Sequence, residues 1–160
     1  MDADQIVKNF TVGRGPCRIV LGWGAANLIM RFDLIDSVRE ESSDRIVAIK
    51  LVSRAEEYLG DHFPTYPVLP GVMMVETMVQ AARRLLGRRL DDPHCRHVLG
   101  EVKVMRFASM VRPGEALEVE VEIVKVLEDG TFSCRGKGVV RRGGSSETVA
   151  NGRFTMRPVR

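Results

Sequence analysis

His62 and Glu76 are the two residues whose types and spacing could support acid–base chemistry. They lie 14 positions apart, on either side of a stretch in which proline recurs at every third position. Prolines restrict the backbone, so His62 is expected on a stiff loop and Glu76 on the helix that follows. Burial favours the neutral forms of both groups, a carboxylic acid and an imidazole base. Spacing alone also permits a structural role, in which His62 caps the loop and Glu76 forms a side-chain ladder with Gln80 and Arg83.

The dipeptide Pro70-Gly71 stands where this helix would begin. A glycine N–H at the positive end of a helix dipole can hold a carbonyl oxygen on which negative charge develops. In the simpler alternative, Gly71 only lets the chain turn into the helix. The proline spacing also matches a polyproline ligand, but such ligands are exposed and the flanking residues here are apolar: Phe63, Tyr66, Val68 and Leu69.

The elements that must position these residues are one helix and a set of strands. A helix is expected over residues 72–86, with Gly87 as its C-terminal cap. Its apolar residues cover nearly the whole circumference, which predicts burial all round, with one polar stripe of Glu76, Gln80 and Arg83. Strands are expected around residues 31–40 and over 45–52, 98–110, 116–127, 132–141 and 148–156.

Short turn sequences separate the later strands, so an antiparallel meander is expected. A meander with one long buried helix is an α+β layout, in which a sheet wraps around the helix. Residues 1–28 match no regular pattern and are interpreted as an N-terminal extension of uncertain structure. Residues 29–160 are interpreted as one domain.

Composition restricts the class of protein. The 160 residues include 24 Lys+Arg and 21 Asp+Glu, for a formal charge of +3, and 44% are apolar. These values are typical of a globular domain. The acidic start of the chain argues against a signal peptide, and its most apolar window is too interrupted to span a membrane. The three cysteines, Cys17, Cys95 and Cys134, form no paired motif, which favours reduced thiols and a cytoplasmic location.

Other clusters were weighed as sites. One segment is rich in metal-ligand types, but its spacing matches no four-ligand pattern and no metal is expected: Asp91, Asp92, His94, Cys95 and His97. Basic residues near the helix end either complement the helix dipole or dock an acidic partner: Arg83, Arg84, Arg88 and Arg89. A second basic patch is expected on a late strand and its turn: Arg135, Lys137, Arg141 and Arg142. Nucleic-acid binding is disfavoured, because no aromatic readout motif accompanies these patches.

Residues 61–82, DHFPTYPVLPGVMMVETMVQAA, resemble the signature of the 3-hydroxyacyl-acyl-carrier-protein dehydratases of type II fatty acid synthesis. The match has no gaps, and these positions stand in register: His62, Phe63, Pro64, Pro67, Pro70, Gly71, Val72, Glu76 and Gln80. The resemblance continues more weakly over residues 32–156, where Arg106-Phe107 and Val111-Arg112-Pro113-Gly114-Glu115 are similar to a second family segment.

The resemblance implies a hot-dog fold and dehydration of (3R)-3-hydroxyacyl chains on acyl carrier protein. By that resemblance His62 is the base, Glu76 is the acid, and the Gly71 N–H stabilises the thioester oxygen. The residues expected to position the substrate are Gln80, Phe63, Tyr66, Pro70, Val72 and Met73. The family needs no cofactor beyond the phosphopantetheine that carries the substrate. Its members assemble as homodimers, or as trimers of dimers, and His62 and Glu76 would then come from opposite subunits.

Two departures from the family pattern lie beside this site. Thr65 replaces the usual glycine, and Asp61 replaces a small residue. An aspartate there could hold His62 in its charged form, which predicts a catalytically silent acyl-binding protein as one alternative. An acyl thioesterase on the same fold is the other. Glu76 matches the branch that only dehydrates, whereas the isomerising branch carries aspartate. Acyl chain length and pathway are not specified by these residues.

Overall fold

The computed structural model describes residues 32–92 and 96–159 of the chain. Contacts divide the chain into two units, residues 1–31 and 32–160. The N-terminal extension expected over residues 1–28 lies outside the described residues. Within the described ranges, no helix has the length and apolarity needed to cross a membrane.

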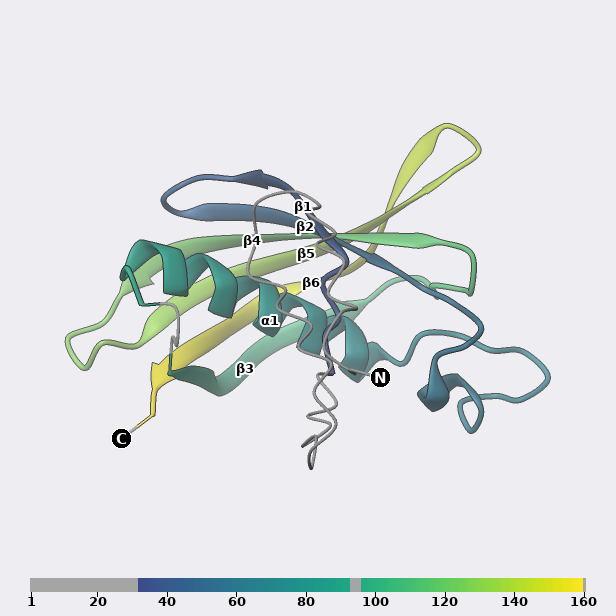
Figure 1. Ribbon diagram of the computed structural model, residues 1–160, viewed down its shortest axis with the longest axis horizontal. Coiled ribbons are helices and arrows are strands. Elements are labelled where there is room, and N and C mark those ends of the chain that lie inside the picture. The colour runs from purple at the N-terminus through teal and green to yellow at the C-terminus, as the bar shows by residue number, and fades with distance from the viewer. Residues whose placement is uncertain (1–31, 93–95, 160) are drawn as a thin grey trace, which may run out of the picture. The chain divides into compact units, whose positions relative to one another are not determined.

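One antiparallel sheet of six strands forms the body of the described unit (Figure 1). Its order is β1-β2-β4-β5-β6-β3, so β3 is an edge strand although it is third in sequence. The strands are β1 Ser37–Glu41, β2 Arg45–Leu51, β3 His97–Phe107, β4 Ala116–Val126, β5 Phe132–Arg142 and β6 Ser145–Pro158. A short 3-10 helix, η1 Glu57–Leu59, lies between β2 and the long helix.

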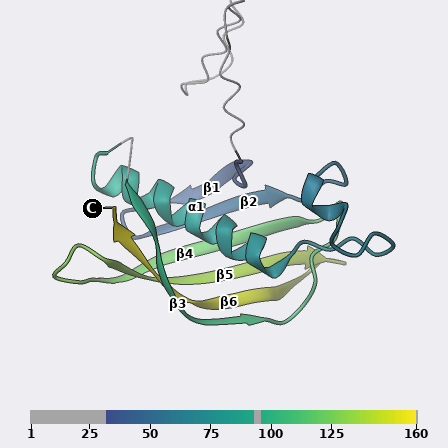
Figure 2. The ribbon, with the colours of Figure 1, turned by 90° about the horizontal axis from the view of Figure 1, so that it is seen from below.

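The long helix α1, Gly71–Arg89, lies across one face of this sheet (Figure 2). The alternation seen in the sequence of β4 explains how the sheet receives it. Leu117, Val119 and Val121 are fully buried beneath the helix, and the glutamates between them point to the other face. Helix residues that complete the core are Met74, Met78, Val79, Ala81, Ala82, Leu85 and Leu86.

Two glycines of β5 bring the middle of α1 close to the sheet. A Cβ placed on Gly136 would lie 2.6 Å from the Met78 sulfur and 3.1 Å from the Phe154 ring. A Cβ on Gly138 would lie 3.2 Å from Leu117. Because glycine has no Cβ, these two positions leave the space that the Met78 side chain occupies.

Several expected boundaries were wrong. The helix does not end at Gly87 but runs to Arg89, and its C-cap is Leu90. It is also not buried all round, because 72% of Val72 is exposed. Strand β6 begins at Ser145 rather than Thr148, because Gly143 and Gly144 both adopt positive φ. That geometry lets a two-residue turn pair Arg142 directly with Ser145.

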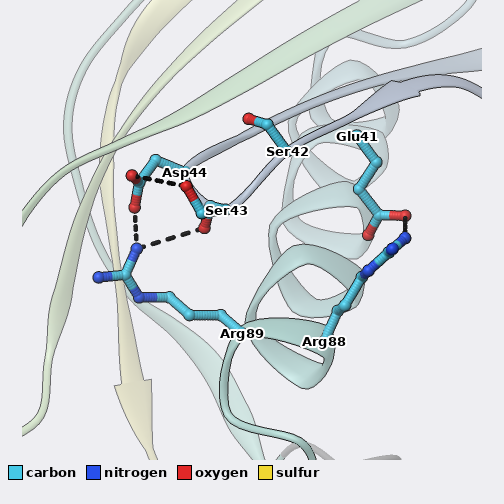
Figure 3. Close-up of a pocket in the computed structure, with 6 residues that line it drawn as sticks. All are labelled: Glu41, Ser42, Ser43, Asp44, Arg88 and Arg89. Atoms are coloured by element: carbon cyan, nitrogen blue, oxygen red, sulfur yellow. Dashed lines mark hydrogen bonds and ion pairs between the residues drawn. The ribbon is translucent and has the colours of Figure 1, made fainter.

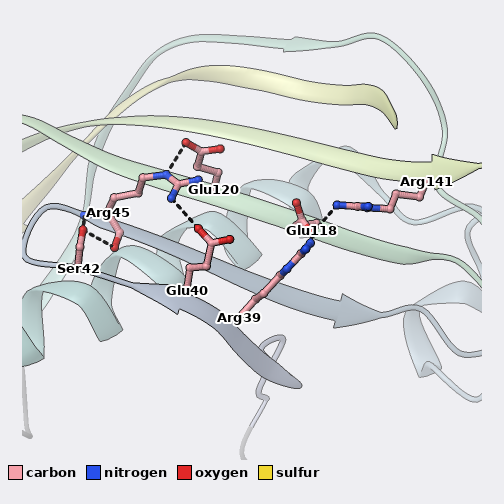
Figure 4. A network of polar contacts seen from close by, with 7 residues as sticks. All are labelled: Arg39, Glu40, Ser42, Arg45, Glu118, Glu120 and Arg141. Carbon is pink, nitrogen blue, oxygen red and sulfur yellow. Dashed lines mark hydrogen bonds and ion pairs between the residues drawn. The ribbon is translucent and has the colours of Figure 1, made fainter. Parts of the chain in front are cut away.

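Charged side chains on the outer face of the sheet form ion pairs with one another (Figure 4). Arg45 pairs with Glu120 at 2.8 Å and with Glu40 at 2.9 Å, and the Arg45 guanidinium lowers the pKa of Glu120. Arg39 pairs with Glu118 at 2.6 Å. The second basic patch expected from the sequence is therefore largely neutralised, since Arg135 and Arg141 face glutamates and Arg142 also has carboxylate partners.

Candidate active site

The loop that carries His62 contains a tight turn. The Tyr66 N–H donates to the Phe63 carbonyl at 2.8 Å, so Pro64 and Thr65 occupy the two central positions. Proline suits the first of these positions, and Thr65 is not among the residues with positive φ. A side chain at position 65 is therefore compatible with the turn. The strained residue is Phe63, whose φ of 61° is unusual for a residue with a Cβ.

His62 is held in one tautomer. Its Nδ1 lies 2.8 Å from the carbonyl oxygen of Val68, and its ring packs at 4.5 Å against the Phe63 ring. A carbonyl oxygen can only accept, so Nδ1 must carry the proton of this hydrogen bond. In the neutral ring, Nε2 then keeps its lone pair. The half-buried imidazole thus retains a ring nitrogen that can accept a proton.

The start of α1 is fixed by backbone contacts. Leu69 is buried, and its N–H donates to the Val111 carbonyl at 2.7 Å. The Pro70 carbonyl accepts from the N–H groups of Met73 and Met74, which closes the first helical turn. Gly71 lies against Phe107, because a Cβ there would be 3.1 Å from that ring.

Two donors remain open at this helix end. Within the described part of the chain, the N–H groups of Gly71 and Val72 make no hydrogen bond. Helix N-termini favour anions and developing negative charge, for which these donors are available. The role of the Gly71 N–H toward a thioester oxygen stays a prediction.

Glu76 is oriented by Gln80, one helical turn later. The Gln80 Nε2 donates to Glu76 Oε1 at 3.0 Å and to the Phe32 carbonyl at 3.1 Å, while Gln80 Oε1 accepts from the Leu34 N–H at 2.8 Å. Both amide protons are used, and the segment before β1 is bound to the helix beside Glu76. These two backbone partners have no recognisable side-chain signal, so the sequence analysis did not identify them.

His62 lies on the loop before α1, Gly71 begins the helix, and Glu76 and Gln80 follow in its second and third turns, but the structure does not join the proposed acid to the proposed base. In the described ranges of one chain, no hydrogen bond or ion pair connects His62 with Glu76. Phe63 is 58% exposed and Tyr66 45%, and the Tyr66 ring is covered by the Arg112 guanidinium at 4.8 Å. Met73 is half-buried, whereas Met74 and Met78 belong to the core.

An exposed apolar strip follows the edge strand next to this end of the helix. On β3, Val102 is 42% exposed, Val104 45% and Phe107 50%. Among the described residues, β3 pairs only with β6 and is an edge strand of the sheet. Val104 pairs with the exposed Arg153, whereas Val102 and Phe107 pair with the buried Phe154 and Ala150, so these apolar residues lie on both faces of the edge strand. An exposed apolar edge is of the kind that is covered by another chain.

The opposite end of α1 is built differently (Figure 3). A hollow of about 720 Å³ is lined by Glu41, Ser42, Ser43, Asp44, Arg88 and Arg89. Arg88 pairs with Glu41 at 2.7 Å, and Arg89 pairs with Asp44. These two arginines, considered above for docking an acidic partner, therefore hold the β1–β2 turn to the helix.

The ligand-rich segment gives no metal site among the described residues. No group of three or more His, Cys, Asp or Glu side chains there is arranged to hold a metal ion. His94 and Cys95 lie outside the described ranges.

A long helix packed on an antiparallel sheet of this order defines a hot-dog domain. The family model described as ApeI-like, ApeI dehydratase, matches residues 38–145. The chain belongs to this family.

Individual relatives agree with this assignment. The chain is 38% identical over 118 residues to the 3-hydroxyacyl-(acyl-carrier-protein) dehydratase FabZ of Ruminiclostridium cellulolyticum, covering 66% of this chain and 83% of the relative. It is 33% identical over 117 residues to FabZ of Clostridium perfringens, covering 66% and 84%. The solved dehydratase heterocomplex ApeI:P from Xenorhabdus doucetiae has the same fold, with a TM-score of 0.59 at 15% identity over 77% of this chain and 96% of that one.

Proposed function

We propose that this protein dehydrates (3R)-3-hydroxyacyl groups on acyl carrier protein to trans-2-enoyl groups, as a hydro-lyase of fatty acid or lipid biosynthesis. The similarity to FabZ dehydratases supports the substrate class. The observation that carries the residue assignment is the hydrogen bond from His62 Nδ1 to the Val68 carbonyl, because it leaves Nε2 free to accept a proton.

Three groups divide the reaction between them. His62 Nε2 removes the proton on the carbon next to the thioester, and the electron pair forms the new double bond. The β-hydroxyl leaves as water after taking a proton from Glu76, which Gln80 holds in place. The open Gly71 N–H donates to the thioester oxygen as negative charge develops there. The proton gained by His62 must then return to Glu76 before the next turnover.

The remaining residues of the site contact the acyl chain in this proposal. Phe63, Tyr66, Pro70, Val72 and Met73 supply apolar surface around the helix start, of which Val72 and Phe63 are exposed in a single chain. Such surface binds an alkyl chain and excludes water from the acid and base. The reaction needs no redox or metal cofactor, because only protons are transferred, and phosphopantetheine carries the substrate.

A second copy of the chain completes the site. Within the described residues of one chain, no hydrogen bond or ion pair joins His62 to Glu76, and the apolar residues of β3 are exposed. Pairing of two β3 edges would bury this strip and bring His62 of one subunit toward Glu76 of the other. We therefore expect a homodimer, which can associate further into a trimer of dimers.

The two alternatives fit the site less well. A thioesterase needs a carboxylate that activates water and has no use for a histidine with its Nε2 free. A silent acyl-binding protein would require Asp61 to hold His62 in the charged form. Asp61 is exposed, and no ion pair joins it to His62 within residues 32–92. Thr65 fits its turn.

A cytoplasmic location follows from the proposed partner. Acyl carrier protein would deliver the substrate there, and the buried thiol of Cys134 suits a reducing compartment. Burial raises the pKa of this thiol to about 12, so it is unreactive near neutral pH.

The decisive experiment is an assay of wild type, His62→Ala and Glu76→Gln on a 3-hydroxyacyl-acyl carrier protein. Both variants should lose about 10²- to 10⁴-fold in kcat, the usual contribution of a positioned acid or base. Hydration of the matching enoyl thioester should fall equally. Release of free thiol by wild type would support the thioesterase instead. A folded dimer without either activity would support the silent protein.

A further inference from the structure

Arg142 is bonded through every donor of its guanidinium group. Its Nε and Nη2 form a fork on Glu115, at 2.7 Å and 2.9 Å. Its Nη1 donates to Ser109 Oγ at 3.2 Å and to Glu147 at 2.5 Å, and its Nη2 also donates to the Met110 carbonyl. A guanidinium has five N–H donors, and this one has five acceptor atoms.

Four of these five acceptors lie in one loop. Ser109, Met110 and Glu115 belong to the segment between β3 and β4, while Arg142 ends β5 and is bonded from outside that segment. The same guanidinium lowers the pKa of Glu115, so this carboxylate stays ionised and paired. Only 32% of the Arg142 side chain is exposed. The contact is thus a partly shielded clamp rather than a surface ion pair.

The loop held by Arg142 contacts the segments that carry the candidate site residues. Its Val111 is fully buried, and the Val111 carbonyl accepts the Leu69 N–H at 2.7 Å. Leu69 directly follows Val68, whose carbonyl orients the His62 ring. Phe107, at the start of the loop, lies against Gly71. A shift of this loop would therefore move both the carbonyl that sets the histidine and the surface beneath the open Gly71 N–H.

We propose that Arg142 is a positioning residue for the reaction, which holds the Ser109–Glu115 loop so that the loop in turn fixes Val68, His62 and Gly71. The inference rests on the proposed dehydratase function. Arg142 acts through other groups and does not contact substrate. A lysine could keep the charge at this position but cannot form the fork and the three further bonds together.

The test compares Arg142→Lys and Arg142→Gln with Arg45→Lys in the full chain. Arg45 is a matched control, because it also pairs with two glutamates. It lies on the outer face of the sheet, and these ion pairs involve neither the Ser109–Glu115 loop nor the loop that carries His62. Steady-state kinetics give kcat and KM separately. Amide hydrogen exchange at Leu69 reports whether its bond to Val111 persists, a readout that a loss of general stability does not change selectively.

Both Arg142 variants should lose about ten- to a hundred-fold in kcat, the effect of a small misplacement of catalytic groups, with a smaller change in KM. Leu69 exchange should become at least several-fold faster, while exchange in the core of α1 is unchanged. Arg45→Lys should leave kcat and Leu69 exchange at wild-type values. Should the Arg142 variants not fold, Ser109→Ala removes one clamp bond and should shift both readouts less, in the same direction.

Three results would overturn the inference. Unchanged Leu69 exchange would mean that Arg142 does not hold the loop. Faster exchange at unchanged kcat would mean that the loop does not control the chemistry. An equal loss of kcat in Arg45→Lys would point to general destabilisation. If wild type shows no dehydration, the proposed function fails, whereas the exchange comparison still decides whether the clamp exists.

Discussion

The two ends of α1 are opposite in character. At its start, the Gly71 and Val72 N–H groups find no acceptor among residues 32–92 and 96–159, Val72 is exposed, and the preceding loop contains Phe63 in a strained conformation. At its end, Arg88 and Arg89 are paired with carboxylates of the β1–β2 turn (Figure 3). One helix thus has a satisfied end that stabilises the fold and an unsatisfied end that is available for chemistry. Strain and open donors of this kind are typical of functional sites.

The largest effect is expected from a change that prevents the proposed dimer from forming at β3. Val104→Asp places a charge in the apolar strip of β3, where the proposed partner subunit would bury it. The variant should be a monomer in analytical ultracentrifugation and should lose about a hundred-fold or more in dehydration, because His62 then lacks its Glu76 partner.

Val126→Asp is the matched control for this experiment. Val126 is 49% exposed on β4, close to the 45% of Val104, but it lies outside the strip. It should stay dimeric and active. A dimeric, active Val104→Asp variant would exclude β3 as the subunit interface.

An intermediate effect, with opposite signs for stability and activity, is expected at Phe63. Phe63→Gly relieves the positive φ and should raise the free energy of unfolding by about 1 kcal/mol. It also removes the ring that packs on His62, so kcat/KM should fall about ten-fold. Denaturant unfolding and turnover measure the two quantities. Phe63→Ala should lower activity without the gain in stability, since alanine keeps the strain. A destabilised glycine variant would show that the strain is absent.

The smallest effect is expected at the satisfied end. Arg89→Ser removes an ion pair to Asp44, which is 55% exposed, so it should cost less than about 1 kcal/mol of stability. Dehydration with acyl carrier protein as carrier should stay within two-fold of wild type. A larger rise in KM for the acyl carrier protein would instead identify this end as a docking surface for the acidic carrier.

The same contrast explains what could be predicted from sequence. The helix and the later strands followed from apolar period and turn residues. Their order followed only in part, because a meander predicts β3 beside β4, whereas β3 pairs with β6 at the edge of the sheet and only β4, β5 and β6 are consecutive neighbours. The end of the helix did not follow, because Gly87 predicts a C-terminal cap, whereas the helix continues through it to Arg89. An interior glycine costs a helix only about 1 kcal/mol, and the ion pairs of Arg88 and Arg89 hold the additional turn. Such tertiary contacts have no local signature.

The candidate site was also only partly predictable. Residue types and the family resemblance indicated His62, Glu76 and Gln80. The groups that orient them are mostly backbone atoms distant in sequence, such as the Leu34 N–H for Gln80 and the Val111 carbonyl for Leu69. Arg142 was considered only as part of a basic patch, because the sequence does not reveal that all its donors are paired.

The glycines beneath α1 carry an evolutionary constraint. Met78 fills the space that a side chain on Gly136 would need, and Phe154 closes the remaining room. Because all three lie in the fully packed core, a larger residue at position 136 is tolerated only when position 78 becomes smaller. Among descendants of this sequence, these two positions should therefore change together, and each one restricts the substitutions that the other can accept.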